Sequence, residues 1–175
     1  MHVSSTEEQR TAHQPVPDLG RVGLWAAGLD FLPVSRLRET AAELDALGYG
    51  ALWWGEAVGR EAFTQAMLIL EAAPRMVAAT GIANVWARDA MAANAASRTL
   101  TQAYPGRFLT GLGVSHGPLV EGLRPGNRVY EKPLAHMRSY LDAMDASLYF
   151  AAGGDEPRPA RVLAALGPRM LDLAR

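Results

Sequence analysis

The segment Gly111–Pro118 reads GLGVSHGP and combines small residues with polar side chains that several kinds of active site use. It contains the pattern G-x-S-x-G, so Ser115 could be the nucleophile of a serine hydrolase on a sharp strand-to-helix turn. Its glycines could instead cradle a phosphate group. In a third interpretation an apolar strand ends at Val114, and Ser115 and His116 lie in a loop at the mouth of a barrel.

The spacing around this segment favours the third interpretation. A dinucleotide fingerprint needs G-x-G-x-x-G with a helix that opens on its third glycine. Here the third glycine is one residue out of step, and Pro118 follows it. A nucleophile elbow runs straight into a helix and precedes an acid and then a histidine. Gly and Pro interrupt the residues after Gly117, and the later His136 falls in a predicted helix. A serine hydrolase that uses Ser115 stays as an alternative.

The composition is that of an ordinary globular protein. Of the 175 residues, 49% are hydrophobic and 20% are charged, which favours one domain. The 17 basic and 18 acidic residues are scattered, which argues against a nucleic-acid partner. The sequence has no cysteine, as is common in the cytoplasm. Since no apolar run approaches the roughly 20 residues of a membrane span, we expect a cytoplasmic protein without a membrane partner.

The first residues differ in composition from the rest of the sequence. Residues 1–19 are polar and contain proline, so we expect a flexible leader in which His2 and His13 are solvated rather than metal ligands. We expect one domain over residues 20–175.

Five short apolar runs alternate with amphipathic segments in this domain. Each run is nearly continuous in apolar or small residues, which is typical of a parallel strand covered on both faces. We predict strands over residues 21–29, 50–54, 76–85, 107–114 and 161–166.

Four amphipathic segments predict helices between these strands. Their apolar residues are spaced by three or four, and Gly or Pro marks most of their ends. Asp89 is a plausible cap for the third helix, and Pro133 falls in the first turn of the fourth. The helices are expected over about 34–47, 61–73, 90–104 and 133–148, and residues 167–175 look like the opening of another.

Strand and helix alternate at a spacing that is typical of βαβ units with parallel strands. Two architectures fit, an open doubly wound sheet or part of a (β/α)₈ barrel. A complete barrel typically has about 250 residues and eight strands, whereas five strands are predicted here. We therefore expect an α/β fold, a partial TIM-type barrel of about five parallel strands that is incomplete at its C-terminus.

Polar residues recur at the ends of the predicted strands. Glu56 follows the second strand, Asn84 ends the third, His116 follows the fourth and Gly167 follows the fifth. Taken singly, each has an ordinary structural explanation, such as a cap at a loop or helix start. Because parallel strands end at one rim, where α/β proteins place their ligand sites, their recurrence predicts a site there. The long linker over residues 117–131 is expected to be functional or mobile.

Four stretches of the sequence resemble a known family. They are AAELDALGYGALWWGEAVGREAF (41–63), ATGIANVWARD (79–89), residues 104–145 around GVSHG, and VLAALGPRMLDLA (162–174). In order and spacing they resemble the luciferase-like monooxygenase superfamily, and within it the actinobacterial oxidoreductases that use the deazaflavin coenzyme F420. The resemblance covers essentially everything after the leader.

This resemblance implies a TIM-type barrel and two-electron chemistry. The reaction would be hydride transfer between a reduced deazaflavin or flavin and a small organic substrate, or oxygen insertion when the flavin is FMN. Coenzyme F420 is the implied cofactor, and FMN is the alternative. The ring would lie in the barrel mouth against the early strands, with a backbone distortion near the third strand.

Carried over by position, the resemblance also implies site residues. His116 would be a proton donor or electrostatic partner, because an imidazole titrates near neutrality. Glu56 would be the second catalytic residue, near the ring at the end of the second strand. Contacts with the cofactor would come from Ala83, Asn84, Ser115, Ala165 and Gly167.

Members of this family are longer than this sequence. The missing part would contain strands six to eight and the region that often holds a cofactor phosphate in such barrels. Two hypotheses follow. The chain is either an F420- or flavin-dependent oxidoreductase that closes as a homodimer or with a complementing chain, or a non-catalytic remnant that binds no cofactor.

Overall fold

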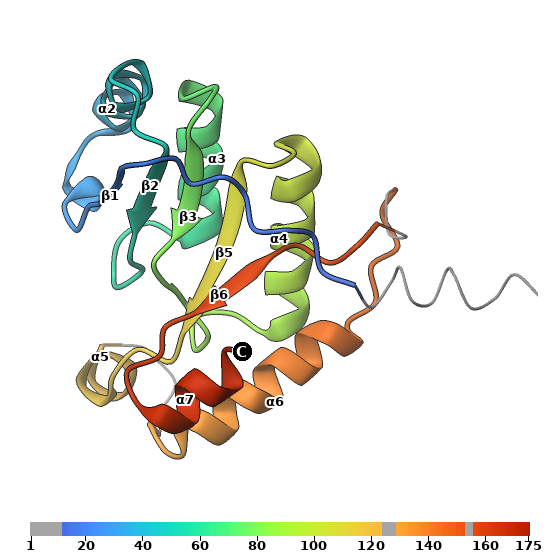
Figure 1. Cartoon of the computed structure of the whole chain (residues 1–175). Helices are drawn as coiled ribbons and strands as arrows, with labels where there is room; N and C mark the ends of the chain where they lie inside the picture. The colour runs from blue at the N-terminus through green and yellow to red at the C-terminus, as the bar shows by residue number, and fades with distance from the viewer. Residues whose placement is uncertain (1–11, 124–128, 153–155) are drawn as a thin grey trace, which may run out of the picture.

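The computed structural model describes residues 12–123, 129–152 and 156–175, and in these residues six parallel strands form one sheet (Figure 1). Along the sheet the order is β1, β2, β3 and β5, with β4 and β6 also paired to β5. β3 and β4 are two parts of the predicted third strand, so neighbouring strands follow chain order. The expected partial barrel is therefore confirmed, and the doubly wound alternative, whose strand order reverses, is wrong. The bounds are β1 (Gly23–Trp25), β2 (Ala51–Trp54), β3 (Val77–Thr80), β4 (Ala83–Asn84), β5 (Phe108–Gly113) and β6 (Arg161–Leu163).

The predicted third strand is divided into β3 and β4 by a slip in pairing. Ala79 lies opposite Leu109 on β5, and Ala83 lies opposite Leu112, so four steps on one strand face three on the other. This two-for-one mismatch is a β-bulge, which bends a strand and re-aims its side chains. The peptide bond between Gly81 and Ile82, inside the slip, is cis. The expected backbone distortion therefore lies at the end of the third strand.

The side chain of Thr80 replaces part of the backbone hydrogen bonding to β5 that the change of register between β3 and β4 interrupts. Its buried hydroxyl donates to the carbonyl oxygen of Gly111 and accepts from the N–H of Gly111, with both contacts at 2.8 Å. Gly111 has to be glycine, because a Cβ there would lie 1.8 Å from the carbonyl oxygen of Thr80. The two strands thus approach each other more closely than a side chain would allow.

The four predicted long helices are present, and their ends follow the expected signals. Asp89 accepts from the N–H of Ala92 at 2.8 Å at the start of α4, and Glu61 accepts from the N–H of Thr64 at 2.7 Å at the start of α3. Gly48, just after α2, has a φ of +86°, the left-handed conformation that suits glycine. The bounds are α2 (Val34–Ala46), α3 (Ala62–Ala72), α4 (Ala90–Ala103) and α6 (Pro133–Ala146), with a 3₁₀ turn η1 (Leu29–Phe31) and α7 (Pro168–Leu173).

One short helix was not predicted. α5 (Gly117–Gly122) begins directly after His116, in the segment that was expected to be a linker. Pro118 lies in its first turn, where the missing N–H costs nothing. Part of the expected linker, residues 124–128, lies outside the described residues.

The two faces of the sheet are buried in different ways. Side chains such as Leu52, Trp54 and Leu112 join the main core with the helices. α2 packs on α3, α3 on α4, and α4 on α6 (Figure 1). The opposite face carries a smaller cluster around Ala79 and Leu109. We call this opposite face, the side that a closed barrel would enclose, the inner face.

Residues 12–20, which we call the strap, run across the sheet near the starts of the strands (Figure 1). The N–H of Gln14 donates to the carbonyl of Arg158 at 2.7 Å, and His13 and Arg158 form an isolated parallel bridge. Leu19 packs against the cluster on the inner face. The strap includes residues that were expected to belong to a flexible leader, whereas residues 1–11, with His2, lie outside the described residues.

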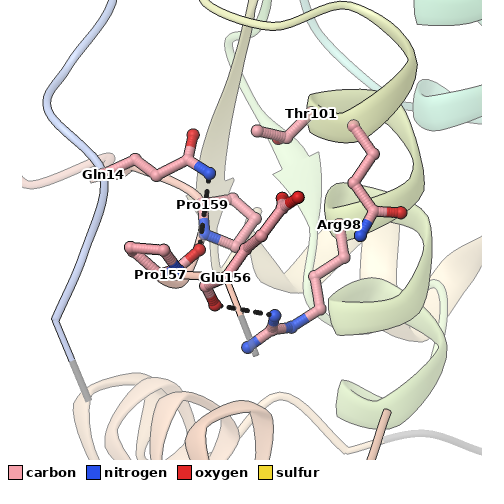
Figure 2. A pocket seen from close by; sticks show the side chains of 7 residues that line it. Gln14, Arg98, Thr101, Glu156, Pro157 and Pro159 are labelled. Atoms are coloured by element: carbon pink, nitrogen blue, oxygen red, sulfur yellow. Dashed lines mark hydrogen bonds between the residues drawn. The ribbon is translucent and has the colours of Figure 1, made fainter. Parts of the chain in front are cut away.

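Figure 2 shows how side chains join the strap to the body of the molecule. The amide of Gln14 donates to the carbonyl of Pro157 at 3.4 Å. From the other side, the guanidinium of Arg98 on α4 donates to the carbonyl of Glu156 at 3.3 Å. Residues before β6 are therefore held between the strap and α4.

No helix in the described parts of the chain is long and apolar enough to cross a membrane.

Candidate functional site

The residues that follow β2, β4, β5 and β6 lie at the carboxyl edge of the sheet. Parallel pairing places them there, because Asn84 lies opposite Gly113 and the N–H of Ala164 donates to the carbonyl of Leu112 at 2.9 Å. All seven sequence-predicted site residues therefore belong to this edge or to the loops that leave it.

Glu56 is held in a nearly buried position, with 6% of its side chain exposed. One carboxylate oxygen accepts from the N–H of Asn84 at 2.8 Å, and the other accepts from the N–H of Ala62 at 3.3 Å, at the start of α3. The same carboxylate forms an ion pair with Arg88. Glu56 thus bridges β4 and α3, and its catalytic role stays a prediction.

Arg88 is the main site residue that sequence reasoning missed. Its side chain is 11% exposed and pairs with Glu56, with Glu61 at 2.9 Å, and with the ring of Phe63, 5.0 Å from the guanidinium carbon. It also donates to the carbonyl of Asn84 at 3.4 Å. The sequence feature that could have identified Arg88 is its position in the segment WARD (86–89), directly before the cap Asp89 and close to the end of a strand.

Glu61 contributes a further negative charge to this cluster. Burial alone would raise the pKa of Glu61, but hydrogen bonds from Thr64, together with nearby Arg88, hold this pKa below its ordinary value. The carboxylate is therefore ionised at neutral pH, so Arg88 faces two negative charges.

Asn84 combines complete burial with an unsatisfied donor. Its side-chain oxygen accepts from the N–H of Trp86 at 3.0 Å, while its side-chain nitrogen has no hydrogen-bond partner among the described residues. Leaving such a group unsatisfied costs about 1–3 kcal/mol. Ala83, its neighbour, is fully buried in the main core. A ligand that accepts a hydrogen bond would satisfy the side-chain amide of Asn84.

Ser115 has an unusual backbone conformation. Its φ is +57°, which is uncommon for a residue with a side chain and often marks a functional position. Two aromatic donors hold this loop: Trp86 donates to the carbonyl of Val114 at 2.9 Å, and Tyr130 donates to the carbonyl of Ser115 at 3.1 Å. His116 follows, exposed, as the residue that precedes α5. The positive φ and the helix that follows are also compatible with a nucleophile elbow, so the hydrolase alternative stays open.

An aromatic cluster supports this loop from α6. The rings of Trp86 and His136 stack with centroids 3.7 Å apart and planes 9° from parallel. Tyr140, one turn further along α6, donates to the carbonyls of Arg88 and Asp89, both at 3.3 Å. Burial raises the pKa of Tyr140 to about 12, so its hydroxyl remains a donor at neutral pH. These contacts fix α6 against the loop that carries Arg88.

Two indoles lie on the inner face beside the bulge. Trp25 and Trp53 are paired neighbours on β1 and β2, and the N–H of Trp25 donates to the carbonyl of Gly81 at 2.7 Å. A Cβ on Gly81 would lie 3.1 Å from the indole nitrogen of Trp25 and 3.2 Å from Trp53. Although it is held in this way, Trp25 remains 56% exposed. Two indoles therefore lie beside the bulge at this edge.

Ala165 and Gly167 follow β6, on the other side of β5. The carbonyl of Gly167 accepts from the N–H groups of Met170 and Leu171, both at 3.0 Å, and so begins α7. With Leu134 and Met170, Gly167 lines an open, largely apolar hollow of about 430 Å³. The structure thus brings Glu56, Ala83 and Asn84 into one cluster, Ser115 and His116 into the next loop, and Ala165 and Gly167 beyond it.

Parallel strands in chain order, with helices outside them and polar groups at the carboxyl edge, define part of a TIM-type barrel. The family model of the luciferase-like monooxygenases matches residues 5–175, so the chain belongs to this family. The resemblance drawn from the sequence is confirmed.

A curated relative and solved structures agree with this assignment. The chain is 32% identical over 122 residues to a Mycobacterium tuberculosis protein whose assigned function is that of a coenzyme F420-dependent oxidoreductase. This match covers 70% of the chain and 33% of the relative. The chain therefore spans about a third of the length of this relative.

Three solved structures share the fold at low sequence identity. An F420-dependent secondary alcohol dehydrogenase in complex with an F420-acetone adduct has a TM-score of 0.72 at 16% identity, over 87% of this chain and 54% of that one. The F420-dependent tetrahydromethanopterin reductase of Methanopyrus kandleri gives 0.63 at 15%, over 92% and 53%. A type II Baeyer-Villiger monooxygenase of Pseudomonas putida, in complex with FMN, gives 0.58 at 12%, over 87% and 50%. The chain thus spans about half the length of these proteins.

Proposed function

We propose that this chain contributes the first part of an oxidoreductase barrel in which hydride passes between coenzyme F420 and a small organic substrate. Membership of the luciferase-like family supports a general oxidoreductase role, and the named relatives use F420 or FMN. FMN, with oxygen insertion, is the alternative chemistry. The observation that carries the proposal is the cluster of site residues at one carboxyl edge, beside the bulge.

The residues of this edge fit a flat cofactor with carbonyl oxygens. Gly81 presents backbone without a side chain beside the indoles of Trp25 and Trp53, where a Cβ would be in tight contact with both rings. Asn84 supplies a buried donor that lacks a partner among the described residues. We assign ring contacts to Ala83 and Asn84 and, on the loops beyond, to Ser115, Ala165 and Gly167.

When bound, the cofactor would supply two electrons and a proton as hydride. The chain would orient the substrate and supply the matching proton. We assign the proton to His116, because its imidazole is exposed at this edge and imidazole is the side chain that most often transfers protons in enzymes. His116 would donate this proton to the oxygen of a carbonyl substrate that accepts the hydride, and would take the proton back when the alcohol is oxidised.

Binding is the first test of this proposal. The purified chain is titrated separately with F420 and with FMN, and the fluorescence of each cofactor is followed. We expect micromolar binding of one of them. Absence of binding by a chain with a folded circular dichroism spectrum would contradict the proposal and support the non-catalytic alternative.

The second test is the variant His116→Ala. We expect turnover of small alcohols or ketones with the bound cofactor to fall by about 10²–10⁴-fold, with little change in cofactor affinity or melting temperature. Labelling of Ser115 by a fluorophosphonate, lost in Ser115→Ala, would instead support the serine hydrolase.

Closure of the barrel needs further strands, and we propose a second copy or a complementing chain as their source. In the described residues β1 pairs only with β2, and β6 pairs only with β5. Sedimentation velocity of the purified chain distinguishes a homodimer from a monomer. A homodimer would support the second copy, and a monomer would exclude it.

A further inference from the structure

The carboxylate of Glu56 extends a hydrogen-bond ladder beyond the end of the β2 backbone. The N–H of Gly81 donates to the carbonyl of Trp54 at 2.6 Å, and the N–H of Glu56 donates to the carbonyl of Ile82 at 3.0 Å. At the next position, the N–H of Asn84 donates to the Glu56 carboxylate at 2.8 Å. A side chain therefore replaces the carbonyl that a longer β2 would have supplied.

Arg88 holds the second polar group of the same residue. It donates to the carbonyl of Asn84 at 3.4 Å and forms the ion pair with Glu56. The N–H of Asn84 is thus held by Glu56, and its carbonyl, which also accepts from the N–H of Ala87 at 2.9 Å, is contacted by Arg88. We call Glu56 and Arg88 the clip.

Stability alone gives no reason for a clip of this kind. Removing two charges from water costs several kcal/mol per ion, and apolar residues of similar volume often replace a buried ion pair without loss of stability. An apolar pair could fill this space, but it could not accept the hydrogen bond from the N–H of Asn84. The clip supplies directional contacts at the strand that the bulge displaces.

We propose that Glu56 and Arg88 are positioning residues, which hold Asn84 so that β4 presents a fixed backbone and amide to the ring bound at the carboxyl edge. This inference rests on the proposed function for the identity of the ring, whereas the clip itself acts in the chain without a cofactor. Glu56 in this role acts through Asn84 and exchanges no proton with substrate.

The experiment separates positioning from stability by removing both charges together. In the double variant Glu56→Leu/Arg88→Met neither member of the buried pair is left as a lone charge. We therefore expect the free energy of unfolding to fall less than in Arg88→Met, because mainly backbone N–H groups lose a partner. Two measurements should still change. Amide hydrogen exchange at Asn84, relative to that at Ala78 in β3, should rise at least about tenfold, and affinity for F420 or FMN should fall about tenfold or more.

A matched control uses a second ion pair far from this edge in the sequence. Arg161 binds both carboxylate oxygens of Asp145, at 2.8 and 2.9 Å. The double variant Asp145→Leu/Arg161→Met removes a comparable pair. Exchange at Asn84 and cofactor affinity should both stay within about twofold of the wild type, because no contact of this pair reaches β4.

Each outcome decides the proposal. Wild-type exchange at Asn84 in the clip variant would overturn it, as would wild-type affinity for a cofactor that the unmodified chain binds. If the unmodified chain binds neither F420 nor FMN, the proposed function fails, and exchange at Asn84 alone decides the clip. If the double variant does not fold, Glu56→Ala replaces it, in which Glu61 still pairs with Arg88. Unchanged exchange at Asn84 in that variant would overturn the proposal.

Discussion

Two arginine–carboxylate clusters lie in different surroundings in this molecule. The clip is nearly buried, with 6% of Glu56 and 11% of Arg88 exposed. The second, which we call the strap cluster, contains Asp145, Arg161, Arg158 and His13. Its Asp145 and Arg161 side chains are 30% and 20% exposed. The same chemical groups are thus used at a high desolvation cost in one place and at a lower cost in the other.

The difference follows from what each cluster holds. The strap cluster joins the end of α6, β6 and the strap, which are segments of secondary structure that need only be kept together. Partly solvated pairs of this kind stabilise a protein by a modest amount. The clip holds individual backbone groups of a displaced strand. The more deeply buried ion pair is therefore the one that orients individual backbone groups, beside the candidate site.

The largest expected effect comes from breaking the clip on one side only. Arg88→Met leaves the Glu56 carboxylate buried and uncompensated, so we expect the free energy of unfolding to fall by about 3–5 kcal/mol. Urea denaturation measures this loss. In the control Arg36→Met, which removes an exposed pair with Glu39, the loss should stay below about 1 kcal/mol. A similar loss in both variants would remove the distinction between buried and exposed pairs.

The next largest effect is expected from an uncharged contact near the same edge, the Thr80 hydroxyl. Thr80→Val removes the hydroxyl that serves both the N–H and the carbonyl of Gly111, so we expect a loss of about 1–3 kcal/mol from groups left unsatisfied. Thermal and urea unfolding measure it. Thr99→Val, which removes an exposed hydroxyl bonded to Ala95, is the control and should be nearly neutral. No effect of Thr80→Val would show that the bulge does not need this bridge.

A smaller effect is expected at the strap cluster. Arg161→Met removes a bidentate contact with a carboxylate that is partly solvated, so we expect a loss of about 1 kcal/mol or less. Urea denaturation beside Arg88→Met gives the comparison directly. Equal losses in the two variants would contradict the contrast in burial on which the comparison rests.

The smallest effect is a pH dependence confined to the strap cluster. Burial, with Arg161 nearby, lowers the pKa of His13, so the unfolded chain takes up a proton below about pH 6.5 that the folded chain does not. Stability should therefore fall as the pH drops from 7 to 5, and His13→Gln should flatten this slope. A slope that His13→Gln leaves unchanged would exclude His13 as its source.

Asp145 should act at lower pH in the same cluster. Burial opposes ionisation, but hydrogen bonds and charge from Arg161 hold its pKa below the ordinary value. The stability that it contributes is present above about pH 4 and is lost as the pH falls through the lowered pKa. Asp145→Asn should remove this second loss in a urea series at pH 5 to 2.5.

The order of strands and helices could be predicted from the sequence because its signals are local. Continuous apolar runs marked the buried strands, and Asp89 and Pro133 marked helix starts within a residue of their positions. The site residues could be placed at one edge because parallel strands end together. The family resemblance added the kind of chemistry.

The features that were missed depend on contacts between distant residues. The division of the third strand follows from its register with β5 and from the close approach of Thr80 and Gly111, 31 residues apart. The partner of Glu56 lies 32 residues away, at Arg88. α5 has only six residues and begins with Gly and Pro, so it offers no helical periodicity. Spacing along the chain contains none of this information.

The position of Trp25 has a practical consequence. Its indole is tied to the carbonyl of Gly81 and yet more than half exposed, beside the place where a coloured ring would bind. If a cofactor ring binds there as proposed, energy from the excited indole would pass to the ring, and the emission of Trp25 would report that binding. Comparison of the emission of the wild type with that of Trp25→Phe would report arrival of the ring without any attached dye.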